Sequence, residues 1–233
     1  MVDVRKKVEE ITPEITQMRV HIHENPELSM KEYNTCALLE DYVKKNVKYD
    51  RLKRVGETGL FFELKGTKPG NGPTIVFRGD IDALPIQEDE HMSPRSKVPG
   101  VMHACGHDVH GTINVGAAKI LSEMKDQFSG SIYFFIQPAE EILQGAKLFL
   151  NDPEIDFDKI DAVAALHVSA ELDAGTIGVR YGAILASADG IRIRINGKGG
   201  HGAHCHTLRD PIVASAAVIN ALQTLVSRET NPA

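Results

Sequence analysis

The segment TIVFRGDID, residues 74–82, indicates the fold class of this chain. A short apolar run passes directly into charged residues, and the same change occurs in IYFFIQPAEE (residues 132–141) and AVAALH (residues 162–167). Runs of this length that are apolar on both faces are typical of buried strands in a sheet covered by helices. Helical patterns at residues 113–128 and 143–150 lie between them. The sequence therefore predicts an α/β layered core.

The N-terminal region has a different pattern. Residues 2–47 show mostly helical spacing of apolar side chains, with a capping box expected at residues 29–32. Residues 60–64 (LFFEL) have the apolar character of one more buried strand.

The pattern changes again after about Ala186. Residues 191–195 (IRIRI) alternate strictly, as a strand with one solvated face does. Asp210 followed by Pro211 predicts the start of an apolar helix. We therefore expect a catalytic core over residues 1–185 and the start of a second domain over residues 186–233.

Composition narrows the class of protein. The 233 residues are 42% hydrophobic and 25% charged, with a formal net charge of -6. This charge argues against a nucleic-acid partner, because such proteins usually show a basic patch. No apolar run approaches the ~20 residues that span a membrane, and the N-terminus does not resemble a signal peptide. Three cysteines are too few for a disulfide framework. From these observations together we expect a cytoplasmic protein without a membrane partner.

Ionisable residues follow three of the predicted strands. Asp80, the Glu140–Glu141 pair and His167 each come directly after an apolar run or within a few residues of it. In open α/β sheets the ligand crevice lies outside the carboxyl ends of the strands. We expect these groups to share one crevice, and the alternative is that they belong to unrelated surface loops.

The segment MHACGHDVH, residues 102–110, adds metal-binding chemistry. It holds three histidines, a cysteine and an aspartate around a glycine, immediately before a predicted helix. Thiolate, imidazole and carboxylate are ligands of Zn²⁺ and neighbouring divalent transition metals. Asp80 or Asp108 is suited to accept a hydrogen bond from a ligand imidazole and so fix its orientation.

Two adjacent carboxylates follow the strand at residues 132–136. A solvated turn is the simple explanation for Glu140 and Glu141, but a preceding apolar strand and a proline place them near the crevice. Because adjacent residues point differently, we expect one carboxylate to bind metal and the other to take a proton from water.

Five segments together resemble a known family. They are HIHENPEL (residues 21–28), RGDIDALP (78–85), MHACGHD (102–108), QPAEE (137–141) and GKGGH (197–201). They are similar to the amidohydrolase branch of the aminoacylase/carboxypeptidase metallopeptidases, which includes hippurate hydrolases, indole-acetyl-amino-acid hydrolases and N-acetyl-diaminopimelate deacetylases. The resemblance extends over essentially the whole chain.

The resemblance implies a site with two divalent metal ions, which are Mn²⁺, Zn²⁺, Co²⁺ or Ni²⁺. It implies four ligands in this chain: Cys105, as a bridge between the ions, His107, Glu141 and His167. The implied reaction is hydrolysis of the amide bond of an N-acyl amino acid or peptide, which releases a carboxylate and a free amino acid.

The resemblance also implies three residues that act beside the metals. Glu140 would be the general base, and Asp80 would support a ligand. His201 would belong to an inserted α+β lid domain through which two subunits dimerise, and it would reach the partner's active site to stabilise the oxyanion.

Two departures from the family pattern affect these expectations. Cys205 stands where the family usually has proline, which leaves the role of His206 open. The family chain continues through the rest of the lid and supplies another histidine ligand to the core. We therefore expect a truncated lid and a chain that is inactive on its own.

The alternatives to an N-acyl amino acid hydrolase are a dipeptidase or carboxypeptidase on the same core, or a metal-binding module without catalysis.

Overall fold

The computed structural model describes residues 3–182 and 190–229. The chain divides into two units, Met1–Ala174 and Gly175–Ala233. The boundary that we predicted near Ala186 lies outside the described residues, so the division into 1–185 and 186–233 remains a prediction.

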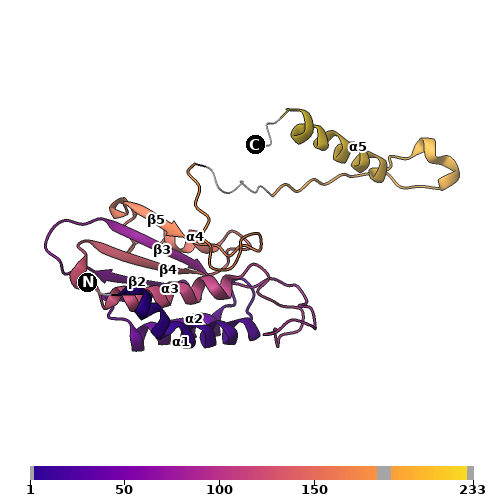
Figure 1. Ribbon diagram of the computed structural model, residues 1–233. Helices are drawn as coiled ribbons and strands as arrows, with labels where there is room; N and C mark the ends of the chain where they lie inside the picture. The colour runs from indigo at the N-terminus through magenta and orange to yellow at the C-terminus, as the bar shows by residue number, and fades with distance from the viewer. Residues whose placement is uncertain (1–2, 183–189, 230–233) are drawn as a thin grey trace. The chain divides into compact units, whose positions relative to one another are not determined.

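The first unit is built on a five-stranded mixed sheet (Figure 1). Its strands are β1 (Arg51–Val55), β2 (Gly59–Lys65), β3 (Thr74–Asp80), β4 (Ser131–Gln137) and β5 (Ala162–Ala165), in the order β1-β2-β4-β3-β5. β3 runs parallel to both β4 and β5, whereas β2 is antiparallel to β1 and β4. Every predicted strand of the core is present, and β1 is an addition that its charged sequence, RLKRV, did not suggest.

Helices cover this sheet. In the first unit these are α1 (Val4–Glu24), α2 (Tyr33–Asn46), α3 (His107–Ser122) and α4 (Gly145–Leu150), with short 3-10 turns η1 (Lys125–Gln127) and η2 (Phe157–Lys159). The first three helices lie together on one face of the sheet (Figure 1). Phe149 of α4 packs into the hydrophobic cluster on the opposite face. The predicted α/β layered core is confirmed.

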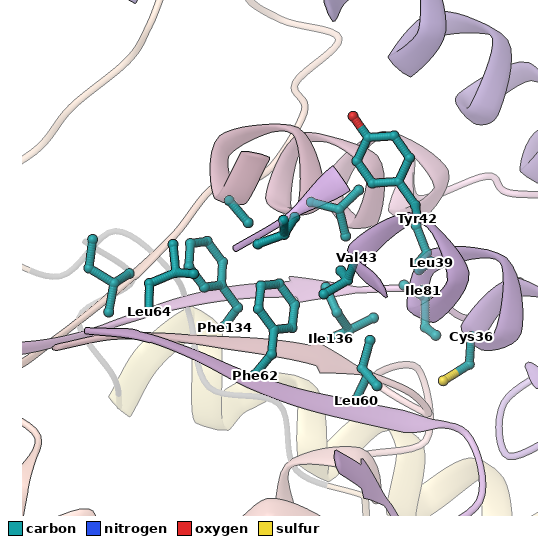
Figure 2. Close-up of a cluster of buried hydrophobic side chains, with 14 of the residues drawn as sticks. Cys36, Leu39, Tyr42, Val43, Leu60, Phe62, Leu64, Ile81, Phe134 and Ile136 are labelled. Carbon is teal, nitrogen blue, oxygen red and sulfur yellow. The ribbon is translucent and has the colours of Figure 1, made fainter. Parts of the chain in front are cut away.

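The larger hydrophobic cluster lies between the sheet and the helices (Figure 2). Phe62 of β2 stacks on Phe134 of β4, with ring centroids 4.7 Å apart and an interplanar angle of 3°. Leu39 and Val43 of α2 belong to the same cluster, and all four side chains are 0% exposed. The neighbouring residue Phe61 packs on the other face of the sheet, as the period of a strand requires.

The prediction that the strands are buried on both faces is correct for β2 and β4, holds only in part for β3, and is wrong for β5. All four residues of β5 are exposed, and Val163 retains 66% of its accessible surface. β4 lies between β2 and β3, whereas β5 pairs only with β3 within the described residues.

Two helix starts differ from their predicted positions. α2 begins at Tyr33 after Glu32, without a side-chain cap, so the expected capping box is wrong. The buried Glu32 carboxylate instead accepts hydrogen bonds from the backbone N–H groups of Met30 and Ala139, at 3.0 and 2.8 Å. α3 begins at His107, six residues before the predicted 113, because Gly106 adopts a left-handed φ of 83° that turns the chain into the helix.

The second unit contains η3 (Gly202–Thr207), α5 (Pro211–Thr224) and the short helical segment η4 (Leu225–Glu229). The predicted cap is confirmed, since the Asp210 carboxylate accepts a hydrogen bond from the Ile212 N–H at 2.8 Å. Residues 191–195 form no strand in the described part of the chain, where Lys198 and Arg209 make one isolated bridge. An alternating segment becomes a strand only when it pairs with another strand.

None of the described helices is sufficiently long and apolar to cross a membrane.

Candidate metal centre

The three parallel strands β3, β4 and β5 end at the same edge of the sheet. Asp80 is the last residue of β3, the Glu140–Glu141 pair follows β4, and His167 follows β5. The sheet topology therefore brings together side chains that are far apart in the sequence, as the strand-end pattern predicted.

Cys105 reaches this edge from the loop before α3, and His107 reaches it as the first residue of that helix. The Cys105 Sγ and His167 Nε2 atoms are 3.3 Å apart. Donor atoms of Cys105, His107 and His167 all lie within 4.8 Å of one another, and the same holds for His107, Glu140 and Glu141. His107 belongs to both groups and thus joins the thiol and imidazole side of the site to the carboxylate side.

The His107 ring is held in one orientation. Its Nδ1 atom lies 3.1 Å from Asp82 Oδ1, and because a carboxylate can only accept, the ring nitrogen donates. In the neutral ring, Nε2 therefore carries the lone pair, and this buried atom has no hydrogen-bond partner in the described structure. It lies 3.8 Å from Glu141 Oε1, a second buried atom without a hydrogen-bond partner. A bare imidazole nitrogen that faces a carboxylate oxygen is suited to bind a cation.

His167 has the same kind of arrangement. Its Nδ1 atom lies 2.7 Å from the Val168 carbonyl oxygen, so this nitrogen must donate. Nε2 is left with the lone pair and faces the Cys105 sulfur. A backbone carbonyl at Nδ1 is a common way for proteins to fix a histidine that binds metal through Nε2.

The charges of the site also fit a cation. Burial raises the pKa of the Cys105 thiol to about 11, and the nearby carboxylates of Glu141 and Glu140 add to this shift. Burial and the charge of Glu140 likewise hold the pKa of Glu141 above its usual value, although His107 partly opposes them. The raised pKa values of the Cys105 thiol and the Glu141 carboxyl shift both groups towards their protonated forms, and a positive ion beside them would oppose that shift. The residues therefore fit the divalent metals that the sequence motifs imply.

Asp80 does not contact the Nδ1 atom of a predicted ligand. Its Oδ1 atom accepts a 2.6 Å hydrogen bond from His110 Nδ1, and its Oδ2 atom lies 2.6 Å from Arg78 Nη1. The other aspartate considered for this task, Asp108, bonds instead to His23 and Arg19. Asp82 is the residue that supports His107.

The sequence analysis did not select Asp82 and His110 as site residues, although a feature of the sequence points to each of them. Asp82 is the second aspartate of the GDID segment, and His110 lies three residues after His107, on the same side of α3. The pattern gave no means of deciding which aspartate faces which histidine.

His201 belongs to the second unit. It is exposed and caps η3, where its Nδ1 atom accepts a hydrogen bond from the Ala203 N–H at 3.1 Å. The role expected for it in a partner subunit's site remains a prediction.

Comparison with known proteins agrees with the chemistry of these motifs. Residues 76–232 match peptidase family M20/M25/M40. The chain belongs to this family. It is 41% identical to the N-acetyl-L-cysteine deacetylase of Bacillus subtilis over 218 residues, and this match covers 92% of this chain and 50% of the relative. It is 38% identical to the N-acyl-L-amino acid amidohydrolase of Geobacillus stearothermophilus over 230 residues, and this match covers 99% of this chain and 61% of the relative.

A solved structure supports the same assignment. The Bacillus subtilis YXEP protein, described as a dinuclear metal binding peptidase from the M20 family, superposes with a TM-score of 0.67 at 36% identity. The superposition covers 74% of this chain and 47% of that protein. The chain therefore spans roughly half the length of these M20 relatives.

The contacts of Asp82 lead to a prediction about metal affinity. Its Oδ1 atom accepts from His107, and its Oδ2 atom accepts from the Ser29 hydroxyl and the Glu141 N–H. In Asp82→Asn one carboxylate oxygen is replaced by an NH₂ group. Whichever way the amide is turned, either the His107 ring N–H loses its acceptor, or the Ser29 hydroxyl and the Glu141 N–H lose theirs. We expect zinc affinity to fall by about 10–100-fold. Isothermal titration with Zn²⁺ measures this change, and Asp126→Asn, an exposed site outside the cluster, is the control. Equal affinities in the two variants would show that Asp82 does not position the ligands.

Proposed function

We propose that this member of the M20 family hydrolyses the amide bond of N-acyl amino acids with the help of two divalent metal ions. The observation that carries the proposal is the meeting of Cys105, His107 and His167 with the Glu140–Glu141 pair at one sheet edge. The relatives named as an N-acetyl-L-cysteine deacetylase and an N-acyl-L-amino acid amidohydrolase support this choice of substrate class.

The metal ligands that we propose are Cys105, His107, Glu141 and His167, with Cys105 as the bridge. A mixed set of thiolate, imidazole and carboxylate accepts Mn²⁺, Zn²⁺, Co²⁺ or Ni²⁺. Bound divalent ions supply Lewis acidity, which polarises a carbonyl group and lowers the pKa of a water molecule.

Two properties favour Glu140 over Glu141 as the general base. The Glu140 side chain retains 34% of its accessible surface, whereas that of Glu141 retains 18%. Glu141 Oε1 is a buried atom without a hydrogen-bond partner, which suits a metal ligand. Glu140 is therefore free to take a proton from water and to deliver it to the nitrogen of the leaving amino acid. Asp80 and Asp82 act by holding His110 and His107.

The second unit is proposed to complete the site from another subunit. We assign His201 to oxyanion stabilisation in the partner subunit of a homodimer that forms through the lid, on the strength of the GKGGH motif. A cytoplasmic location fits the same scheme, because a reducing compartment keeps the Cys105 thiol available for metal.

A substrate panel tests the proposal. A full-length protein that contains this chain is loaded separately with each of the four metals and incubated with acetyl-, benzoyl- and indole-acetyl-amino acids and with unmodified dipeptides. The proposal predicts release of free amino acid from at least one N-acyl substrate and little release from the dipeptides. Hydrolysis of the dipeptides alone would favour a dipeptidase or carboxypeptidase. Tight metal binding without turnover of any substrate would favour a binding module.

A further inference from the structure

A third group of possible metal ligands lies beside the proposed centre. Donor atoms of Asp80, His107 and His110 lie within 4.8 Å of one another, and all three residues are buried. His110 is 1% exposed, and the scheme above names it only as the partner of Asp80. Its contacts determine whether it binds metal or does something else.

Both nitrogens of His110 are already engaged. Nδ1 donates to Asp80 Oδ1 at 2.6 Å, and Nε2 accepts a hydrogen bond from the Val168 N–H at 3.0 Å. The two partners fix a single neutral tautomer, because a backbone N–H can only donate and a carboxylate can only accept. No lone pair of His110 is left for a metal ion. In this respect it differs from His107 and His167, whose Nε2 atoms make no such contact with the backbone.

The bond to Val168 ties an exposed segment to a buried helix. Val168 directly follows His167, and the residues of β5 just before them are all exposed. A hollow of about 240 Å³ separates α3 from β5 and is lined by Asn114, Ala117 and Ala164, among others. Packing between α3 and β5 therefore does little to hold the residues that precede this segment.

Two further contacts lie at the same point. The rings of His110 and His167 meet edge to face, with centroids 4.5 Å apart. A side chain at Gly106 would place its Cβ atom 2.3 Å from Val168 Cγ2, so the segment lies directly against the start of α3. His110 thus contacts the ring of one proposed ligand and the backbone of the next residue.

We propose that His110 is a positioning residue that fixes the segment 167–168 through the Val168 N–H and so holds His167 facing Cys105. The inference rests on the proposed function, because it concerns the same metal centre. It assigns His110 no bond to the metal.

Two amide substitutions separate the two bonds of His110. His110→Asn places an amide near the Nδ1 position, which keeps the Asp80 contact and loses the acceptor for Val168. Gln reaches the Nε2 position and keeps that acceptor. Asn114→Ala is the matched control: Asn114 lies one turn further along α3, is 5% exposed and donates to the Phe77 carbonyl at 3.4 Å, without a hydrogen bond to the segment 167–168.

The readouts are amide hydrogen exchange at Val168 and zinc titration of the whole chain. We expect His110→Asn to speed exchange at Val168 by about fivefold to tenfold, as loss of one hydrogen bond does. We expect it to weaken zinc binding by about 10–100-fold. His110→Gln should restore most of both properties, and Asn114→Ala should change neither.

Several results would overturn the inference. Unchanged exchange at Val168 in His110→Asn would show that the bond does not hold the segment. Faster exchange with unchanged zinc affinity would show that the segment does not position the metal ligand. Nitrogen NMR of the zinc-loaded chain would also contradict it if a His110 nitrogen were bound to metal. Failure of the unsubstituted chain to bind zinc would instead refute the proposed metal centre, and exchange at Val168 would still decide whether His110 holds the segment.

Discussion

Replacing Glu140 by glutamine in a full-length protein that contains this chain is expected to lower the turnover of an N-acyl amino acid by about 10²–10⁴-fold, the range that a general base contributes. The substitution keeps the shape of the side chain and removes its ability to take a proton. Because Glu140 is the more exposed of the two carboxylates, metal binding should be almost unchanged. Steady-state kinetics and metal analysis of the same preparation measure the two effects.

Glu141→Gln is the matched comparison for that experiment. It alters the neighbouring carboxylate, whose buried Oε1 atom lies 3.8 Å from His107 Nε2. We expect this variant to lose metal and activity together. If Glu141→Gln retained metal while Glu140→Gln lost it, the roles of the two residues would have to be exchanged.

The second large effect concerns the fold that carries the site. Phe134 is 0% exposed and stacks on Phe62 at 4.7 Å and on Phe77 at 5.7 Å. We expect Phe134→Ala to lower the free energy of unfolding by about 3–5 kcal/mol, since it removes a large side chain and leaves a cavity. Urea denaturation followed by circular dichroism measures the change.

A matched control separates packing from other effects of the substitution. Leu150→Ala also shortens an apolar side chain, but Leu150 is 62% exposed. It should change the free energy of unfolding by at most about 0.5 kcal/mol. A similarly small effect of Phe134→Ala would mean that the two layers do not pack around β4 as described.

The sequence predicted the core strands and their meeting at one edge for clear physical reasons. Each buried strand has an apolar run of its own length, and parallel strands must end on the same side of a sheet. The Asp210 cap could also be predicted, because only a few residue types are favoured at the N-cap of a helix. These features depend on neighbours in the sequence.

Three features that depend on distant neighbours were not predicted. β1 is charged and is a strand because it pairs with β2. β5 has the composition of a buried strand and yet is exposed, since its environment depends on what packs beside it. Asp80 and Asp82 have similar sequence surroundings, and only the placement of α3 determines that Asp80 contacts His110 and that Asp82 contacts His107.

X-ray absorption spectroscopy of the zinc-loaded chain tests most directly whether Cys105 and the histidines bind a metal ion. We expect a sulfur neighbour at about 2.3 Å together with nitrogen and oxygen neighbours at about 2.0–2.2 Å. Cys105→Ser should remove the sulfur contribution, whereas Cys36→Ser, at a buried cysteine in α2, should leave it unchanged. A zinc spectrum of the unsubstituted chain with nitrogen and oxygen neighbours alone would contradict the metal centre.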